Sequence, residues 1–377
     1  MRIKFSLLTL LFALCFVSVS LAKSEDKNKK DTPKEVKGFI KHHLKDAHYF
    51  ELFHGAKMPL PIIVWDNGLT YFLSSDFKKV KVKEIMSADS TITFQKLGAN
   101  DTVPKEQQDY LHEAQNSKYS LFHGKIVAAK HADLRLKLNP EGKKKLISHQ
   151  GLLDFSITKT VLMTIIISVL IFFVFTGLSK SYRRAPIPTG FGRLLEPLVL
   201  FIRDDIAIPN IGKAHYKKYM SYLLTVFFFI WFVNLAGMTP LGINITGNIA
   251  ITLSLALITY LITQFTANRN YWGHIFWMPG VPVPMKFVLM PIELLGTIIK
   301  PFSLMIRLYA NITAGHVVLM SLIGLVFFAS NAFSFGAFFG LTLFLGVIEL
   351  LVAFLQAYIF TMLTALYFGA AVEEHHH

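Results

Sequence analysis

From Thr158 onward the chain consists mainly of apolar runs that are long enough to cross a lipid bilayer. Three of these runs match the ~30 Å hydrocarbon core at the rise of a helix, and two are about twice as long. The shorter runs are Val161–Leu178, Tyr219–Met238 and Ile249–Phe265, and the longer runs are Phe287–Phe328 and Ala332–Ala371. This pattern predicts an all-α polytopic membrane protein with about five membrane helices.

The composition agrees with a membrane protein. Of the 377 residues, 53% are hydrophobic and only 16% are charged. Soluble domains have about 25% charged residues, so an ordinary soluble enzyme is excluded. The net charge of +14 could suggest a nucleic-acid partner, but the positive charge lies outside the apolar runs. We therefore expect membrane lipid, and no nucleic acid, as a partner.

The two long runs require a special arrangement. A helix over Phe287–Phe328 would have 42 residues and would be roughly 63 Å long at ~1.5 Å per residue. Either each run forms two helices, or each forms one steeply tilted helix. Pro291 and Pro301 can bend the first run without ending it. We favour a hairpin of two tilted helices that turns near Ser330–Asn331.

The first residues have the parts of a secretory signal peptide. Arg2 and Lys4 precede the apolar stretch Phe5–Val19, and Ser20-Leu21-Ala22 has small residues at the positions before a cleavage site after Ala22. Cys15, the single cysteine, lies in this stretch, so the exported segment would have no disulfides. The sequence therefore predicts four parts: a signal peptide at 1–22, an exported periplasmic domain at 23–153, a membrane domain at 154–372 and a C-terminal tail at 373–377.

The exported segment has the composition of a small water-soluble domain with mixed α/β structure. Pro61–Trp65 and Leu69–Leu73, separated by a turn with Asn67-Gly68, predict a β-hairpin. We expect a further strand at Thr91–Phe94 and a short helix at Lys105–Gln115. The domain either packs on the outer face of a larger complex or simply extends the N-terminus.

Several histidines near the start of this domain raise the question of a metal site. They are His42, His43, His48 and His54. No cysteine and no His-Glu-x-x-His spacing accompanies them. We expect packed or solvated histidines and no metal.

Basic residues set the expected topology. The loop between the first two apolar runs contains eight of them: Lys180, Arg183, Arg184, Arg193, Arg203, Lys213, Lys217 and Lys218. Such a density of Lys and Arg in a short loop marks the cytoplasmic side. With five spans, the N-terminal domain then lies in the periplasm and the C-terminus in the cytoplasm of a bacterial inner membrane.

Polar residues inside the long runs form two stripes. At about 100° per residue, Glu293, Lys300 and Asn311 lie within about 40° of Arg307, whereas His316 lies about 180° away. In the last run, three residues lie within about 20° of Glu349. They are Thr342, Gln356 and Tyr367. These residues either join helices through hydrogen bonds or carry function.

Arg307 is the residue that is hardest to explain as structural. An arginine at membrane depth costs from about 3 to more than 10 kcal/mol unless it is paired or hydrated, and it stays charged. No acid lies within eight residues of it in the sequence. Glu349 is a possible partner across the hairpin, but a carboxylate from another protein chain fits better.

Three segments together resemble one family. Pro301–His316 closely resembles the signature helix of subunit a of F-type ATP synthases. Gln356–Tyr367 resembles the last helix of that subunit, and Phe229–Pro240 resembles its second span. The resemblance covers roughly residues 155–372, in order and with the family's spacing.

The resemblance implies a non-catalytic, proton-conducting stator subunit that presses its last two helices against a rotating ring of c subunits. Arg307 would face the ring carboxylate and separate two half-channels. His316 and Glu349 would line the outer half-channel, and Glu293 the inner one. Five further polar positions are implied near the path or in support of it: Asn311, Gln356, Asn234, Lys300 and Tyr367.

The implied partners are the c-ring subunits, subunit b of the peripheral stalk and other F-type ATP synthase subunits. No Gly-rich phosphate loop occurs, so nucleotide chemistry would belong to partner chains and no cofactor is expected. The alternative function is an ion-coupled secondary transporter with a charged site at midplane, a class that usually has paired repeats. Proton or sodium coupling, and a native or tag origin for His375–His377, stay open.

Overall fold

The structure is a computed structural model of the whole chain. It describes residues 46–51, 57–66, 68–86, 91–96, 108–114, 118–122, 124–128, 135–138, 144–146, 152–184, 192–239, 245–278, 280–328 and 331–373. The chain forms two compact units, one of Asp46–Leu162 and one that contains Met163–His377. The predicted signal peptide lies outside the described residues, as do His42, His43 and His54.

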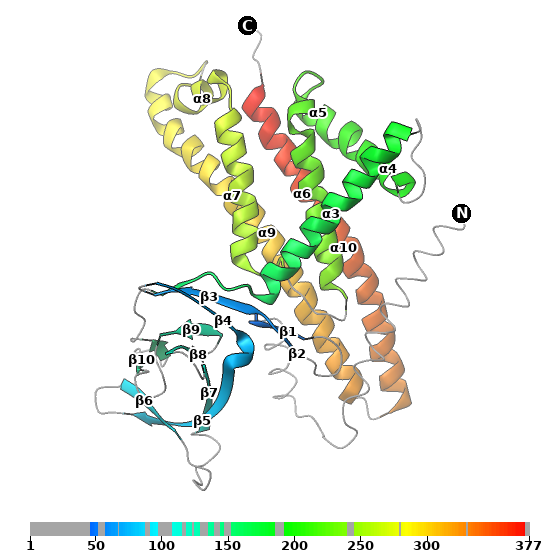
Figure 1. Cartoon of the computed structure of the whole chain (residues 1–377). Coiled ribbons are helices and arrows are strands. Elements are labelled where there is room, and N and C mark those ends of the chain that lie inside the picture. The colour runs from blue at the N-terminus through cyan, green and yellow to red at the C-terminus, as the bar shows by residue number, and fades with distance from the viewer. Residues whose placement is uncertain are drawn as a thin grey trace. The chain divides into compact units, whose positions relative to one another are not determined.

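The N-terminal unit consists of antiparallel strands (Figure 1). Its elements are β1 Tyr49–Glu51, β2 Lys57–Pro59, β3 Pro61–Trp65, β4 Leu69–Leu73, the 3-10 helix η2 Ser74–Asp76, β5 Phe77–Met86, β6 Thr91–Lys96, β7 Gln108–Ala114, β8 Ser120–Phe122, β9 Lys125–Val127, β10 Arg135–Leu138, β11 Lys144–Leu146 and β12 Leu153–Asp154. They form sheets in the orders β1-β2, β11-β10-β6-β5-β7-β8-β9 and β12-β3-β4.

The predicted hairpin is confirmed. β3 and β4 pair with Trp65 opposite Leu69 and Pro61 opposite Leu73. The strand predicted at Thr91–Phe94 is also confirmed and extends to Lys96.

The predicted helix at Lys105–Gln115 is wrong. Gln108–Ala114 forms strand β7, which pairs with β5 from Phe77 to Lys83. Leu111 of this strand is completely buried. Pairing with a long neighbouring strand and burial of Leu111 outweigh the local helix propensity of the segment.

The helical unit follows. Its elements are α3 Lys159–Arg184, α4 Gly192–Phe201, the π-helical segment η4 Ile202–Ala207, α5 Ile208–Ile211, α6 Tyr216–Gly237, α7 Ile249–Thr266, α8 Arg269–Phe276, α9 Val283–Phe328 and α10 Ala332–Val372. Among the described residues, five of these helices are long and apolar enough to cross a membrane: α3, α6, α7, α9 and α10. The prediction of a polytopic helical membrane protein is therefore confirmed, together with the small extra N-terminal domain.

Each of the two long apolar runs forms one continuous helix. α9 has 46 residues and passes through Pro291 and Pro301 without a break, and α10 has 41 residues. α9 ends at Phe328 and α10 begins at Ala332, on either side of the position where the sequence predicts the hairpin to turn. α10 packs against both α9 and α6, and α7 packs against α9 (Figure 1).

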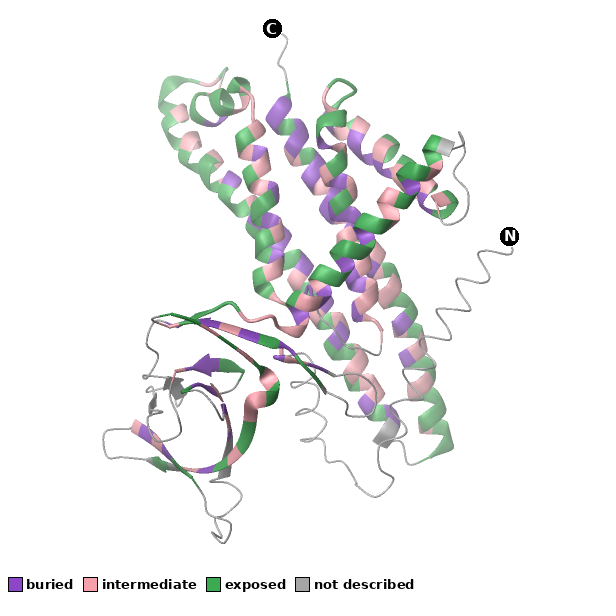
Figure 2. Ribbon diagram, viewed as in Figure 1, coloured by how far each residue is buried: buried purple, intermediate pink, exposed green. Residues whose placement is uncertain are grey.

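The interior of the helical unit is built around α6 and α10. Phe227 and Phe228 of α6 and Phe360 and Phe368 of α10 have almost no exposed surface. Buried residues concentrate on the facing sides of these helices, whereas the outer sides of the unit are exposed (Figure 2). Exposed side chains on those outer sides include Phe172, and an apolar outer surface is what a lipid environment requires.

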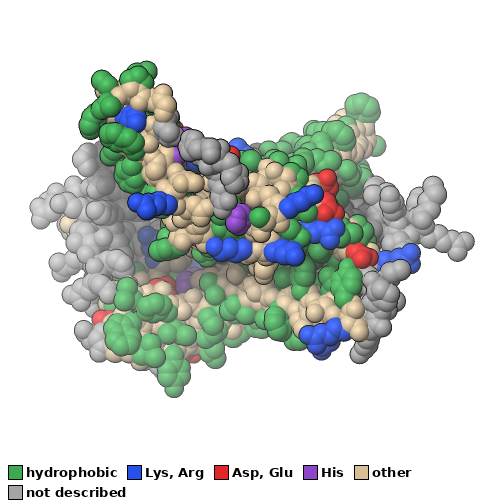
Figure 3. Space-filling model, turned by 90° about the horizontal axis from the view of Figure 1, so that it is seen from above, with side chains coloured by type: hydrophobic (Ala, Val, Ile, Leu, Met, Phe, Trp, Pro, Cys, Tyr) green, Lys and Arg blue, Asp and Glu red, His purple; other side chains and the backbone are tan. Residues whose placement is uncertain are grey.

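One end of the helical unit carries α5, α8 and the C-terminal end of α10 (Figure 1). The backbone nitrogen of Asn268 donates a hydrogen bond to the carbonyl oxygen of Ala371 at 2.8 Å, which fixes α8 beside the end of α10. Lys and Arg side chains gather across this end (Figure 3).

Candidate functional site

The two polar stripes of α9 and α10 meet along the hairpin. Asn311 Nδ2 donates a hydrogen bond to Gln356 Oε1 at 2.9 Å. Farther from the turn, Lys300 Nζ lies 5.4 Å from the centre of the Tyr367 ring. Polar residues that are distant in the sequence therefore form one seam between two antiparallel helices.

A titratable pair lies in the same seam, nearer to the turn. His316 Nδ1 is 3.4 Å from Glu349 Oε1, and the two side chains are only 8% and 11% exposed. Gly315 allows this approach, because a Cβ atom at that position would lie 3.2 Å from Glu349 Oε1. Glu349 Oε2 is buried and has no hydrogen-bond partner within the described part of the chain. A carboxylate beside an imidazole can accept a proton and pass it on, and Glu349 Oε2 is the carboxylate oxygen that does not face His316.

Arg307 does not take part in these contacts. Its side chain is exposed on α9, near the exposed apolar side chains of Phe302 and Ile306. Over the ranges that the structure describes, no carboxylate forms an ion pair with it, and Glu349 pairs with His316 instead. Arg307 is close enough to Tyr367 for an electrostatic interaction. A permanent cation on an apolar face needs water or a partner from outside.

Two buried amides fix the helices near the seam. Asn234 of α6 donates to the carbonyl oxygen of Ala353 at 3.4 Å and accepts a hydrogen bond from Thr246 at 3.1 Å. Gln356 is buried, and its Nε2 atom finds no partner among the residues described. Asn234 therefore joins helices, whereas Gln356 has unused hydrogen-bonding capacity. Thr342 donates a hydrogen bond to the carbonyl oxygen of Phe338 on its own helix.

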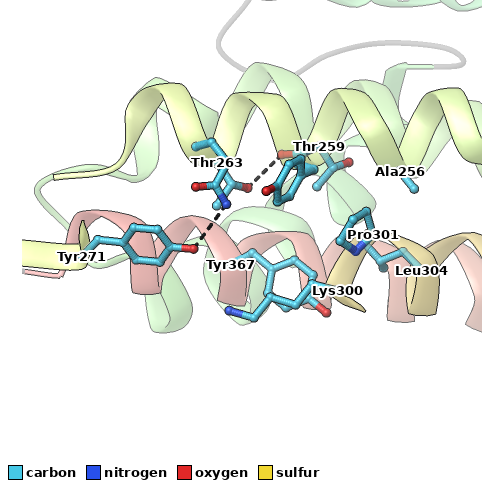
Figure 4. A pocket seen from close by; sticks show the side chains of 10 residues that line it. Ala256, Thr259, Thr263, Tyr271, Lys300, Pro301, Leu304 and Tyr367 are labelled. Atoms are coloured by element: carbon cyan, nitrogen blue, oxygen red, sulfur yellow. Dashed lines mark hydrogen bonds between the residues drawn. The ribbon is translucent and has the colours of Figure 1, made fainter. Parts of the chain in front are cut away.

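A pocket lies between α7, α8, α9 and α10 (Figure 4). Its lining includes polar side chains from three helices: Thr259, Thr263, Gln264, Tyr271 and Lys300. Tyr367 closes part of its wall beside the Lys300 side chain (Figure 4).

The hydroxyl of Tyr271 at this pocket stays protonated over a wide pH range. Burial raises its pKa, the hydrogen bond from Gln264 at 3.4 Å opposes this, and the nearby Tyr260 and Glu293 raise it again. Glu293 also attracts the Lys300 ammonium. Glu293 therefore interacts with two residues that line the pocket, although it is not itself part of the lining.

Sequence analysis did not identify the contribution of α7 and α8 to this pocket. For α7 the sequence contains a pattern that could have indicated it. Small or polar residues recur at helical spacing and are buried in the structure: Thr252, Ala256, Thr259 and Thr263. Tyr271 carried no such signal, since α8 is a short helix outside the apolar runs. As for metals, the described residues contain no group of three His, Cys, Asp or Glu side chains that could hold an ion.

The fold and the seam define a polytopic membrane protein whose last two helices form a long hairpin with a buried titratable pair. The sequence model described as ATP synthase A chain matches residues 161–369, which is more than half of the chain. The chain therefore belongs to the ATP synthase A chain family, as the resemblance of its motifs implied. Residues 39–155 match a separate model, described as a domain of unknown function.

Individual relatives agree with the family match. The chain is 41% identical over 233 residues to ATP synthase subunit a of Chloroherpeton thalassium, which covers 60% of this chain and 70% of the relative. It is 37% identical over 278 residues to the subunit a of an Anaeromyxobacter species, with 68% and 67% covered. It is 41% identical over 239 residues to that of Myxococcus xanthus, with 60% and 76% covered.

Proposed function

We propose that this chain is the proton-conducting stator subunit of an F-type ATP synthase. The observation that carries the proposal is Arg307, a cation on an exposed apolar helix face with no ion-pair partner in the described chain. Such a cation is suited to meet a carboxylate of a neighbouring ring of c subunits. It attracts the ionised carboxylate, favours release of its proton and repels a proton that would cross directly. Protons then cross only by moving with the ring.

His316 and Glu349 form the outer half-channel in this proposal. A proton path needs a titratable group or a water molecule within hydrogen-bond reach at each step. The pair supports such a path because the two groups lie 3.4 Å apart and are nearer to the α9–α10 turn than Arg307 is. Asn311 and Gln356 continue the polar seam from this pair toward Arg307.

The pocket between α7 and α10 belongs to the inner half-channel. Its polar lining, together with Glu293 beside it, offers groups that hydrate a leaving proton. Lys300 and Tyr367 support the wall between this pocket and the seam.

The proposed topology places the N-terminal domain, residues 23–153, in the periplasm after removal of the signal peptide 1–22, and the C-terminal tail 373–377 in the cytoplasm. The gathering of Lys and Arg side chains at one end of the helical unit (Figure 3) supports a cytoplasmic position for that end. Subunit b and the soluble subunits of the synthase are the further partners. The membrane domain then comprises residues 154–372 of a bacterial inner-membrane protein.

The test is an Arg307→Ala variant in membrane vesicles that contain the whole synthase. We expect ATP-driven proton pumping to be lost while the complex still assembles. Arg307→Lys should recover little activity, because an ammonium can lose its proton and has no planar fork. Arg269→Ala, which removes an exposed cation at the start of α8, is the matched control and should pump normally. Normal pumping by assembled Arg307→Ala complexes would refute the proposal.

A further inference from the structure

The three-stranded sheet β12-β3-β4 of the N-terminal unit is apolar on both faces. One face contributes Ile62 and Val64 to the core of the unit, where both are completely buried. The residues that alternate with these point to the other face, and six of them are large, apolar and exposed. They are Trp65, Leu69, Tyr71, Leu73, Leu153 and Phe155. We call this set the apolar sheet face.

The strand register brings these side chains together. Trp65 is opposite both Leu69 and Leu153, and Tyr71 is opposite Ile63. The backbone nitrogen of Phe155 donates to the carbonyl oxygen of Ile63 at 2.9 Å, which continues the pairing beyond β12. Directly paired residues of an antiparallel sheet lie on the same face. Tyr71 is 81% exposed, and Leu69 and Phe155 are each 61% exposed.

This apolar surface is not a general property of the unit. Among the exposed positions described on β5 of the larger sheet, three are lysines, Lys78, Lys79 and Lys81, and one is apolar, Ile85. A soluble domain seldom leaves several large apolar side chains side by side in water, and such a patch marks a place of contact.

The chain itself indicates what covers the patch. Only Ser156, Ile157 and Thr158 separate Phe155 from the start of α3, which is a membrane-spanning helix. Backbone hydrogen bonds fix this connection to the unit. The backbone nitrogen of Ile157 donates to the carbonyl oxygen of Pro61 at 3.1 Å, and that of Lys159 donates to the carbonyl oxygen of Ala47 at 2.9 Å. Four residues reach at most roughly 14 Å, so the apolar sheet face is held near the level at which α3 enters the bilayer.

The residue types of the apolar sheet face suit the interface between the hydrocarbon core and the head groups of a bilayer. Tryptophan and tyrosine are enriched where hydrocarbon meets the head groups, because each ring has an apolar body and a polar tip. Leucine and phenylalanine on the same surface add apolar area that can enter the acyl boundary.

We propose that the apolar sheet face docks on the lipid bilayer and seats the N-terminal unit at the membrane interface, with Trp65 and Tyr71 at head-group level. The inference requires that α3 crosses the membrane and does not depend on proton conduction.

Spin labels on the full-length chain in phospholipid vesicles test this proposal. Cys15→Ser provides a cysteine-free background, and Tyr71→Cys and Leu69→Cys each receive a nitroxide. Lys81→Cys is the matched aqueous control on the same unit, and Leu170→Cys, exposed on α3, is the lipid reference. We expect the ratio of oxygen to nickel-chelate collision rates at both test sites to lie between the two references, severalfold above that at Lys81→Cys and below that at Leu170→Cys, as for side chains at head-group level.

Two results would overturn the proposal. A ratio at Tyr71→Cys and Leu69→Cys equal to that at Lys81→Cys would mean that the face is open to water. Shielding of both labels from oxygen as well as from the nickel chelate would mean that protein covers the face. In that case, broadening of the spectrum that disappears on dilution with unlabelled chain would identify the cover as a second copy.

Discussion

At the scale of single residues, we expect His316 and Glu349 to act as one unit in proton transfer. They are on different helices, 3.4 Å apart and almost fully buried. Because an isolated buried acid holds its proton, we expect each residue to depend on the other for proton transfer. We expect His316→Ala and Glu349→Ala each to slow proton flux, and the double variant to lose less than the sum of the two single losses. Proton flux into vesicles, normalised to the amount of assembled complex, measures this.

A variant in which His316 and Glu349 are exchanged provides a second test of the same prediction. His316→Glu combined with Glu349→His keeps one acid and one imidazole in contact, so part of the flux should return. Ser321→Ala, which removes an exposed hydroxyl on α9 that bonds only to its own helix, is a control and should conduct normally. If both single alanine variants assembled and conducted normally, the pair would have only a packing role.

The residues of this site differ in how far the sequence could predict them. The sequence alone selects Arg307 as a candidate, because a permanent charge in an apolar run has few structural explanations, and its role stays a prediction. The contact between His316 and Glu349 followed from the resemblance, and the hairpin structure brings the two together as expected. The close contact at Gly315 was not predictable, since it arises from the spatial neighbour Glu349, whose Oε1 atom would lie 3.2 Å from a Cβ at this position.

At the scale of elements, α10 depends on a close approach to α5. A Cβ atom at Gly369 would overlap the backbone carbonyl oxygen of Asn210. Because a backbone atom cannot move aside cheaply, Gly369→Ala should force α5 and α10 apart. Overpacking typically costs about 1–3 kcal/mol and occasionally more. We expect a lower midpoint of thermal unfolding for the purified complex, or a smaller yield of assembled complex.

The same helix offers a matched control. Gly340 has open space where its Cβ would be, so Gly340→Ala should leave unfolding and assembly unchanged. Equal behaviour of the two variants would contradict the packing of α5 against α10.

The elements also show where sequence patterns reach their limit. The long apolar helices were predictable because length and hydropathy act within one segment. β7 was mispredicted because its pairing with β5 is a contact between separate segments. The succession of the three helical elements α4, η4 and α5 was not predicted. This short amphipathic stretch contains Pro197 and Pro209 and has no simple periodicity.

At the scale of the whole molecule, charge separates the two sides of the membrane. The segment from Lys180 to Lys218, between the apolar parts of α3 and α6, contains eight Lys and Arg residues. Lys and Arg side chains gather at one end of the helical unit (Figure 3). Such residues stay on the cytoplasmic side. With five candidate membrane spans in the described residues, we expect the N-terminal unit and the C-terminus to lie on opposite sides of the membrane.

This topology predicts opposite labelling of two cysteines in the Cys15→Ser background. Lys81→Cys, exposed on β5, should react with a membrane-impermeant thiol reagent added outside intact cells, because its unit is exported. Ser181→Cys, at the C-terminal end of α3, should react only after the cells are opened, because the basic residues beside it hold that end inside. Mass tagging of the denatured protein measures both reactions, and equal labelling after lysis shows that both thiols are reactive. The reverse labelling pattern would show that the proposed topology is wrong. The end of the hairpin that contains the His316–Glu349 pair would then lie on the cytoplasmic side.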